Sequence, residues 1–196
     1  MLSKKIELIM REVMKNKKGV SFFFTFVFLM NSVSAATIFS DDFEDGSISD
    51  WTVYHNGTAN NWFASSNDPQ QGSFHAEDQP QDANNPAFME RNISTAGYQN
   101  ITFRYYRKLV GLDTADNFEA QWFNGNAWVI VEQTEGTSVN DASYVFKEFN
   151  LTSSSNNNAN FRLRFLCEAG AVSELCRVDN INLTGNVLPD STSPLV

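Results

Sequence analysis

Glu132 and Glu135 form the carboxylate pair whose spacing is closest to a known chemistry. They lie three positions apart, and a glycoside hydrolase needs two carboxylates that flank the bond it cleaves. The chain has 23 acidic residues, however, so two of them will often lie this close by chance. No Gly-x-Ser-x-Gly, His-Glu-x-x-His or phosphate-binding glycine loop occurs in the sequence. We therefore expect a protein without catalytic activity, with a glycosidase as the alternative.

Length and charge limit the number of domains and the kinds of partner. The chain has 196 residues, 42% of them hydrophobic and 19% charged, which is enough for one folded domain. Its 23 acidic and 14 basic residues give a net charge of −9. Nucleic-acid binding requires clustered lysine and arginine, so we do not expect a nucleic acid as a partner.

The first 36 residues have the order of an export signal. Basic residues at 15, 17 and 18 precede an apolar run over residues 20–30, and small residues follow at 32–36. This order predicts a signal peptide over residues 1–36, cut after Ala35 or Ala36, with Met14 as a second possible start. The apolar run is shorter than the roughly 20 residues that a membrane-spanning helix needs. We expect a secreted or cell-surface protein.

A second interpretation of this segment stays open. Lys17-Lys18-Gly19 directly before the apolar run resembles archaeal pilin-type signals, which are cut after the glycine. The run would then be kept as an anchor or assembly helix, and it would be the protein's only contact with a membrane. Residues 1–36 carry six basic and two acidic residues, so the remainder has eight basic and 21 acidic residues and a net charge of −13.

The residues after position 36 have the pattern of β-strands. Short runs rich in aromatic and β-branched residues alternate with clusters of Asn, Ser, Gly and Thr, which predicts an all-β fold. Asn124-Gly125 separates two such runs and predicts a β-hairpin, because both residues tolerate positive φ. The expected strands cover residues 101–107, 118–122, 128–131, 144–151, 161–167 and 176–183.

The two cysteines lie in the last two expected strands. If these strands pair as antiparallel neighbours with Cys167 opposite Cys176, then Phe165 lies opposite Val178 and the apolar faces agree. In an exported protein this placement predicts a Cys167–Cys176 disulfide. Two buried thiols are the alternative.

The alternation of the last strand breaks after Val178. Ile181 and Leu183 are apolar but have the opposite parity. We therefore predict a β-bulge at Asp179-Asn180, which would change the direction of the Asp179 carboxylate. Alternatively, Asp179 caps a turn or binds backbone groups.

Several of these segments resemble MAM domains and their cysteine-poor microbial relatives. The likeness covers residues 38–185 and implies a jelly-roll antiparallel β-sandwich (concanavalin-like or galactose-binding-like) over residues 37–185. Residues 186–196, with Pro189 and Pro194, are expected to form a flexible tail. The half-cystines of animal MAM domains are missing, which favours the microbial relatives. The matching residues are Asp42-Phe43-Glu44-Asp45-Gly46, Trp51, Trp62, Phe103-Arg104-Tyr105-Tyr106, Phe161-Arg162-Leu163-Arg164-Phe165 and Val178-Asp179-Asn180-Ile181-Asn182-Leu183.

The resemblance also implies a structural calcium ion between the first and last strands. Ca²⁺ takes six to eight oxygen ligands, and carboxylates lie in both segments. Glu44 and Asp179 are the main candidate ligands. Asp42 and Asp45 are further candidates, with solvated turn positions as their alternative.

A glycan site would need exposed aromatic rings, which stack on sugar rings while polar groups bind the hydroxyls. The candidates are Trp62 and Phe63, in Asn60-Asn61-Trp62-Phe63, together with Tyr106 and Phe123. The alternative for Trp62 is the core, where we also expect Trp51, Trp122 and Trp128. Both histidines, His55 and His75, are expected in loops.

The resemblance to MAM domains and their microbial relatives implies an adhesion or carbohydrate-binding module. With the export signal and without a catalytic motif, we expect an exported, non-catalytic module whose partner is an extracellular glycan or a cell-surface protein. An alternative from another class is a surface structural subunit that is held by its N-terminal helix and assembles with copies of itself.

Overall fold

The computed structural model describes residues 35–55, 62–79 and 86–189. These residues form β-strands in two antiparallel sheets and a single 3-10 turn, η1 (Ser153–Ser155). The expected all-β sandwich is confirmed. The described residues contain no helix with the length and apolar character that crossing a membrane requires.

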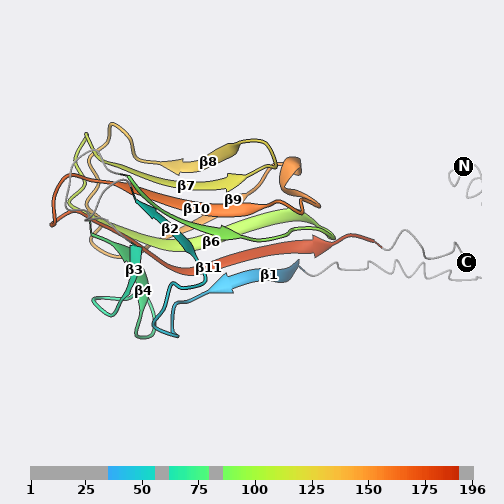
Figure 1. The fold of residues 1–196 in the computed structure, drawn as a ribbon, viewed down its shortest axis with the longest axis horizontal. Helices are drawn as coiled ribbons and strands as arrows, with labels where there is room; N and C mark the ends of the chain where they lie inside the picture. Colours follow the sequence, from blue (N-terminus) through green and yellow to red (C-terminus); the bar gives the residue numbers. More distant parts are fainter. Residues whose placement is uncertain (1–34, 56–61, 80–85, 190–196) are drawn as a thin grey trace, which may run out of the picture. The chain divides into compact units, whose positions relative to one another are not determined.

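The first sheet, called here the six-stranded sheet, is built around the longest strands (Figure 1). β11 lies at its centre and pairs with β6 along one edge, while β1 and β4 pair with different parts of its other edge. The strands in spatial order are β3 (Trp62–Ser65), β4 (His75–Asp78), β11 (Leu175–Val187), β6 (Tyr98–Val110) and β9 (Val145–Asn150), with β1 (Ala35–Asp41) beside β11.

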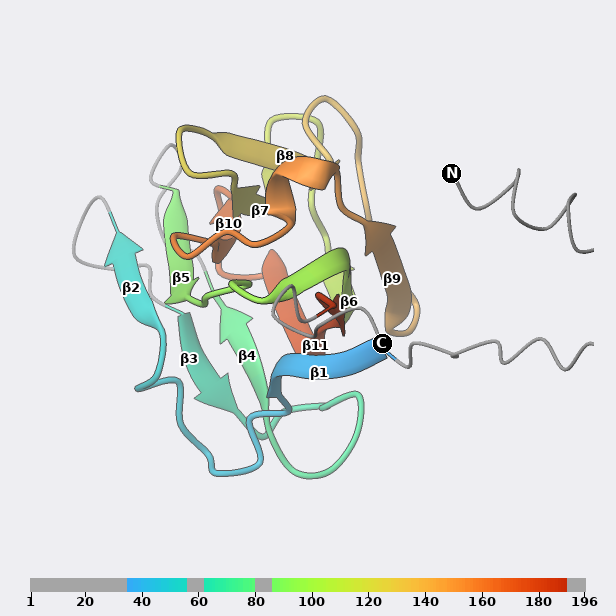
Figure 2. The ribbon, with the colours of Figure 1, turned by 90° about the vertical axis from the view of Figure 1, so that its right-hand side faces the viewer.

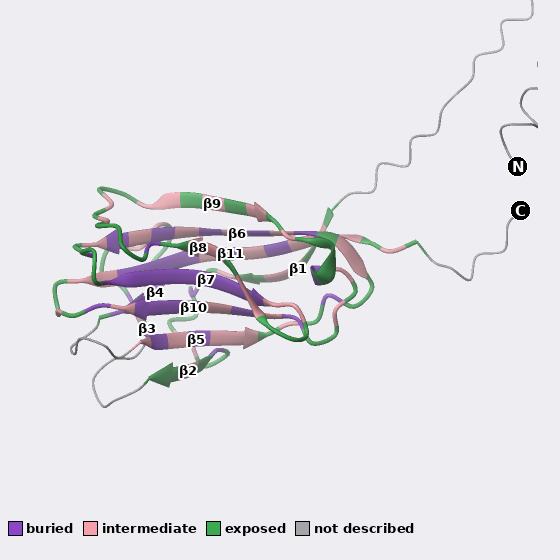
Figure 3. Cartoon of the chain, turned by 90° about the horizontal axis from the view of Figure 1, so that it is seen from above, coloured by how far each residue is buried: buried purple, intermediate pink, exposed green. Residues whose placement is uncertain are grey.

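The second sheet, called the five-stranded sheet, packs against the first (Figure 2). Its central strand pairs with β5 on one side and β7 on the other. The strands in spatial order are β2 (Thr52–His55), β5 (Ala87–Asn92), β10 (Arg162–Glu168), β7 (Asn117–Phe123) and β8 (Trp128–Gln133). Figure 3 shows buried residues along β7 and β10, and exposed residues along the edge strands β2 and β9.

The core is aromatic and is centred on Phe165 of β10. The Phe165 ring lies 5.0 Å from the Tyr105 ring, 5.9 Å from Phe103 and 6.1 Å from Phe118, measured between centroids. Trp51 packs 6.2 Å away and donates its indole N–H to Asp41. These rings come from both sheets, so the apolar alternation of each strand is satisfied by the face of the other sheet.

The predicted disulfide is present, but its setting corrects one expectation. Cys167 and Cys176 are bonded, with their Cα atoms 6.0 Å apart. They do not join neighbouring strands, because β10 belongs to the five-stranded sheet and β11 to the six-stranded sheet. The connection over residues 169–174 is long enough to cross between the sheets, whereas a two-residue turn would have forced pairing. Phe165 and Val178 are both buried, as expected, because both face the space between the sheets.

Two local predictions are confirmed. The β7–β8 hairpin turns at Asn124-Gly125, where Gly125 has φ of 102°. In β11 the register shifts between Asp179 and Asn182, and Asn180 has φ of 49°, so the predicted bulge is present. Asp179 lies on the outer face of the six-stranded sheet by simple alternation, one residue after the buried Val178, and the bulge that follows it returns Ile181 and Leu183 to the core.

The predicted signal peptide, the start at Met14 and the alternative anchor lie in the region before residue 35, outside the described residues. The predicted cleavage positions Ala35 and Ala36 lie in β1, where they pair with Asn186 and Gly185. β11 extends to Val187, and the rest of the predicted tail, residues 190–196, also lies outside the described residues.

Candidate functional site

The outer face of the five-stranded sheet carries aromatic and arginine side chains side by side. Alternation along β10 places Leu163 and Phe165 inside the sandwich and Arg162 and Arg164 outside. Antiparallel pairing then sets the neighbours of each arginine across β5 and β7. We call this surface the aromatic–arginine face; it consists of Phe88, Phe123, Trp128, Arg162 and Arg164.

The side chains of this face stack in an alternating row. The Arg164 guanidinium carbon lies 3.9 Å from the centroid of Trp128 and 4.7 Å from that of Phe88. The Arg162 guanidinium lies 4.1 Å from the Phe123 ring and 5.0 Å from Trp128. Cation–π contacts of this kind hold the arginines in place on the sheet.

The two arginines differ in their ionic partners. Arg162 donates to the Glu90 carboxylate at 2.6 Å. Arg164 donates from Nε to the amide oxygen of Gln121 at 3.0 Å and from Nη2 to the same oxygen. No carboxylate among the described residues lies within 4.0 Å of the Arg164 guanidinium. Burial lowers the pKa of Arg164, although an arginine remains a cation at neutral pH.

A row of buried polar side chains on β7 positions Gln121. The Glu119 carboxylate accepts from Asn117 Nδ2 at 2.8 Å, from Gln133 Nε2 at 3.2 Å and from Gln121 Nε2. With its amide nitrogen bound to Glu119, Gln121 presents its oxygen to Arg164. The orientation of Arg164 is therefore fixed from two sides, by aromatic rings and by this row.

The face continues into a hollow at one end of the sheet. The hollow has a volume of about 540 Å³, and its lining includes Phe123 and Arg162 together with Asn92 and Asn160. Next to the row lie two exposed apolar side chains, Tyr54 on β2 and Ile130 on β8, which are 54% and 46% exposed. The surface thus combines ring faces, amides, guanidinium groups and a concavity.

Several solved structures share this two-sheet architecture. TmCBM61, solved in complex with beta-1,4-galactotriose, matches with a TM-score of 0.56 and 13% identity over 74% of this chain and 94% of its own. The CBM22-1 xylan-binding domain from Paenibacillus barcinonensis Xyn10C matches with a TM-score of 0.54 and 15% identity over 80% and 98% of the two chains. The K2 cleaved adhesin domain of Lys-gingipain has a TM-score of 0.54 and 12% identity, with 74% and 98% covered.

The chain has the fold of a carbohydrate-binding module. No protein-family model and no curated protein sequence matches it. At 12–15% identity these likenesses show the fold alone, and they do not address the resemblance to MAM domains.

The four predicted glycan-binding aromatics do not lie together. Phe123 belongs to the aromatic–arginine face, whereas Phe63 and Tyr106 lie on the outer face of the six-stranded sheet. Trp62 is in the core, 2% exposed, and donates its indole N–H to the Ala87 carbonyl at 3.2 Å. A ring buried in this way has no face for a sugar, so the structure removes Trp62 from the candidates.

Sequence reasoning missed Trp128, which we expected in the core. It pairs with Phe123 across the β7–β8 hairpin and shares the outer direction of that residue. The register of the hairpin shifts between Ala120 and Gln121. Because of this shift, Trp128 and Ile130 face outward while Glu132 faces the interior, a change that alternation within β8 alone does not reveal.

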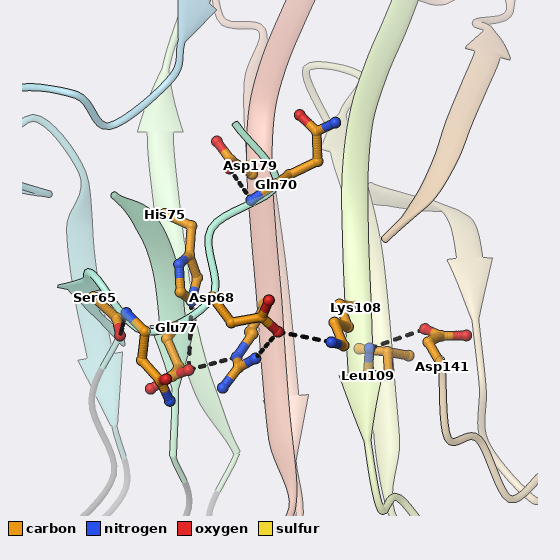
Figure 4. A network of polar contacts seen from close by, with 11 residues as sticks. Ser65, Asp68, Gln70, His75, Glu77, Lys108, Leu109, Asp141 and Asp179 are labelled. Atoms are coloured by element: carbon orange, nitrogen blue, oxygen red, sulfur yellow. Dashed lines mark hydrogen bonds and ion pairs between the residues drawn. The ribbon is translucent and has the colours of Figure 1, made fainter. Parts of the chain in front are cut away.

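The predicted calcium ligands Glu44 and Asp179 bind backbone groups of one loop. This loop, residues 66–74 between β3 and β4, crosses the outer face of the six-stranded sheet, and we call it the strap (Figure 4). Glu44 accepts from the backbone nitrogens of Ser73 and Phe74 at 2.8–2.9 Å. Asp179 accepts from the Gln70 nitrogen at 2.9 Å.

These contacts do not fit a calcium ion at the same carboxylates. The second oxygen of Asp179 accepts from the Asn180 nitrogen at 2.7 Å, so N–H groups point at the positions where a cation would bind. Asp42 and Asp45 each accept from a backbone nitrogen two residues ahead, at 3.3 and 2.9 Å, as turn residues do. Burial raises the pKa of Asp179 to about 6.

The strap also closes a cluster of charged side chains. Asp68 binds Arg177 at 3.0 Å and Lys108 at 2.7 Å, and Arg177 binds Glu77 at 2.5 Å (Figure 4). His75, which we expected in a loop, is fully buried in β4 beneath the strap, 3.4 Å from Glu77. Glu77 and Arg177 are buried as a pair of opposite charges, which makes their burial tolerable, while the Asp68 side chain stays 54% exposed.

A different group of three carboxylates lies close enough together to share a cation. Asp113, Asp116 and Glu174, called here the acidic triad, have ligand oxygens within 4.8 Å of one another. Elsewhere in the described ranges, no group of three or more acidic, histidine or cysteine side chains reaches this proximity. Burial raises the pKa of Asp116. Asp116 accepts from the Asp113 nitrogen at 2.6 Å, and Glu174 accepts from two backbone nitrogens of its own loop.

The candidate glycosidase pair is not arranged for catalysis. Glu132 faces the interior, where it binds Arg107 at 2.7 Å and Lys147 at 2.6 Å and accepts from the Tyr105 hydroxyl. Its side chain is 8% exposed. Glu135 lies in the loop after β8 and accepts from Gln133 at 2.8 Å. A carboxylate held by two cations inside the sandwich cannot protonate an external substrate.

Proposed function

We propose that this protein is an exported, non-catalytic carbohydrate-binding module and that the aromatic–arginine face is its glycan site. The observation that carries the proposal is the gathering of three aromatic rings and two arginines on one outer sheet face beside a hollow. The fold supports it, because structures described as binding xylan and galactotriose share it.

The chemistry of this face matches that of a sugar polymer. Sugar rings have apolar C–H faces and a rim of hydroxyls, so they need flat apolar contacts together with directed donors and acceptors. Trp128, Tyr54 and Ile130 supply apolar contact, while Arg164 and the amides of β7 and the hollow supply polar groups. An extracellular glycan is therefore the proposed partner, and a cell-surface protein is the alternative that the same surface would serve.

Affinity electrophoresis against a panel of soluble polysaccharides tests the proposal with the full chain. We expect retardation by at least one polysaccharide and a loss of affinity of about tenfold or more in Trp128→Ala. Tyr106→Ala removes an aromatic side chain from the opposite sheet and is the matched control, so it should bind like the wild type. Normal binding by Trp128→Ala with loss in Tyr106→Ala would move the site to the six-stranded sheet. Absence of binding to the entire panel would contradict the proposal.

Export is part of the same proposal. A disulfide is stable in an oxidising compartment, and the segment before residue 35 has the order of a signal peptide. N-terminal sequencing of the protein recovered from outside the cell should give a terminus at Ala36 or Thr37. A terminus at Val20 would instead support the retained helix and the surface-subunit alternative.

Calcium binding is also proposed, at the acidic triad. In the described residues each triad carboxylate accepts backbone N–H groups through one oxygen, whereas both oxygens of Glu44 and of Asp179 do so. Three carboxylates supply the hard oxygen ligands that Ca²⁺ prefers, and the triad joins the loop after β6 to the loop before β11. An ion there would stabilise the end of the sandwich that also holds the disulfide.

A further inference from the structure

We propose that the aromatic–arginine face selects glycans that carry an anionic group, a carboxylate or a sulfate ester, and that Arg164 recognises that group. The inference rests on the proposed function, because it names the class of glycan that the same site takes. It follows from two observations: guanidinium groups lie over the aromatic rings, and the Arg164 guanidinium forms no salt bridge among the described residues.

The ring faces of the site are already engaged by cations. Trp128 has the Arg164 guanidinium 3.9 Å from its centroid, and Phe123 has that of Arg162 at 4.1 Å. A sugar that approaches the row therefore meets guanidinium groups between the rings as well as the rings themselves. Guanidinium groups only donate hydrogen bonds, so this surface favours a ligand with strong acceptors.

Arg164 is the arginine of the row that forms no salt bridge within 4.0 Å among the described residues, although Glu90, its cross-strand neighbour, and Glu119 lie near enough to act on its charge. Arg162 is bound to Glu90 at 2.6 Å, whereas both hydrogen bonds of Arg164 go to the neutral amide oxygen of Gln121. A guanidinium has five N–H groups, and the remaining ones on Arg164 donate to no described residue. A carboxylate or sulfate can accept two of them in parallel, the geometry in which arginine binds such groups most strongly.

The arginine is also preorganised for this role. Its guanidinium lies over the Phe88 and Trp128 rings, and Gln121 is fixed in turn by Glu119. Binding an anion therefore requires little ordering of the side chain, which preserves affinity. The net charge of −13 after removal of residues 1–36 repels polyanions at long range, but physiological salt screens that repulsion beyond about 8 Å. Recognition must therefore come from the direct contact.

The test compares ligands that differ only in charge. The full-length wild type is titrated at 150 mM salt with polygalacturonate, with the same polymer after full methyl esterification, and with neutral beta-1,4-galactan. Carrageenan and its desulfated form provide the sulfate arm. We expect at least about tenfold tighter binding to one charged polymer than to its neutralised form, as a charge-assisted hydrogen bond predicts. Preference in the first arm assigns a carboxylate, and preference in the second assigns a sulfate.

Variants test whether Arg164 causes the preference for charged polymers. Arg164→Gln should lose the preference for the charged polymer, while Arg164→Lys should keep part of it. Arg104→Gln, on the opposite sheet where Arg104 is paired with Glu148, is the matched control and should bind like the wild type. If Arg164→Gln does not fold, the comparison of charged and neutral polymers on the wild type still decides whether the face selects anionic glycans. Equal binding of charged and neutral polymers overturns this inference alone, whereas no binding to any polysaccharide overturns the proposed function.

Discussion

Replacing Asp78 by asparagine should stabilise the domain at pH 8 and should have little effect at pH 4. Asp78 lies on β4 between Trp62 and Cys176 of the neighbouring strands, and it is 0% exposed. Neither of its carboxylate oxygens has a hydrogen-bond partner in the described part of the chain. Burial, together with the charge of Glu77, raises its pKa from 3.8 to about 7.

The sign and size of the effect follow from proton linkage. A carboxyl whose pKa is higher in the folded state favours folding when it is protonated, so its contribution falls as the pH rises from about 4 to about 7 and is constant above that. A shift of about three pKa units corresponds to about 4 kcal/mol. The asparagine side chain has the shape of the protonated acid and carries no charge. The gain from the substitution should therefore be about 4 kcal/mol at pH 8 and below about 1 kcal/mol at pH 4.

Urea unfolding followed by tryptophan fluorescence measures this difference. The wild type and Asp78→Asn are compared at pH 4, 6 and 8, and Asp42→Asn, at an exposed position, is the matched control. A gain in the free energy of unfolding that grows with pH in Asp78→Asn alone agrees with the reasoning. The same gain at all three pH values, or a loss at pH 8, would refute it, because the buried carboxylate would then not be the cause.

Three further predictions concern stability. Replacing both cysteines by serine should lower the free energy of unfolding by about 2–3 kcal/mol, which is the loop-closure value for a separation of nine residues. Chemical denaturation measures this difference. An unchanged free energy of unfolding would mean that the disulfide does not stabilise the contact between the two sheets. Gly72→Ala should cost roughly 1–3 kcal/mol, because φ is +70° and the added Cβ would lie 2.3 Å from the Glu44 carboxyl group. Gly97→Ala, also at positive φ but with open space around it, is its control, and an equal loss at both positions would exclude a steric role for Glu44. Ca²⁺ should raise the melting temperature relative to a chelator in the wild type but not in Asp116→Asn; an equal rise in both would place the ion elsewhere.

Local sequence patterns were sufficient for some parts of the fold. Asn124-Gly125 predicted the β7–β8 hairpin, and the change of parity after Val178 predicted the bulge at Asp179-Asn180. Each of these features is determined by residues close together in the chain. The disulfide was also predictable, because Cys167 and Cys176 both face inward whether their strands are neighbours or belong to opposite sheets.

The assignment of strands to sheets was not predictable from the same patterns. Alternation gives the two faces of a strand, but a six-residue connection permits either a hairpin or a crossing to the other sheet. The crossing places β10 beside β5 and β7, and this non-local pairing brings Phe88, Phe123 and Trp128 around the two arginines. The one available signal was Phe161-Arg162-Leu163-Arg164-Phe165, whose alternation already directs both arginines outward.

The contacts of the predicted calcium ligands were not predictable for a related reason. Glu44 and Asp179 were expected to meet at an ion because the resemblance to MAM-like jelly rolls implies a calcium ion between the first and last strands. The strap comes between them and supplies backbone N–H groups to both carboxylates. Which groups a loop offers depends on its backbone conformation, here including Gly72 at positive φ, and composition does not encode it.

The most direct test of the central claim is an NMR titration of the full-length protein with a polysaccharide that it binds. We predict that the largest shifts occur at the indole N–H of Trp128 and the Nε–H of Arg164, with smaller shifts along β5 and β7. Shifts centred on Tyr106 and Phe146, which form the aromatic pair on the outer face of the six-stranded sheet, would contradict the account and assign glycan binding to the other side of the sandwich.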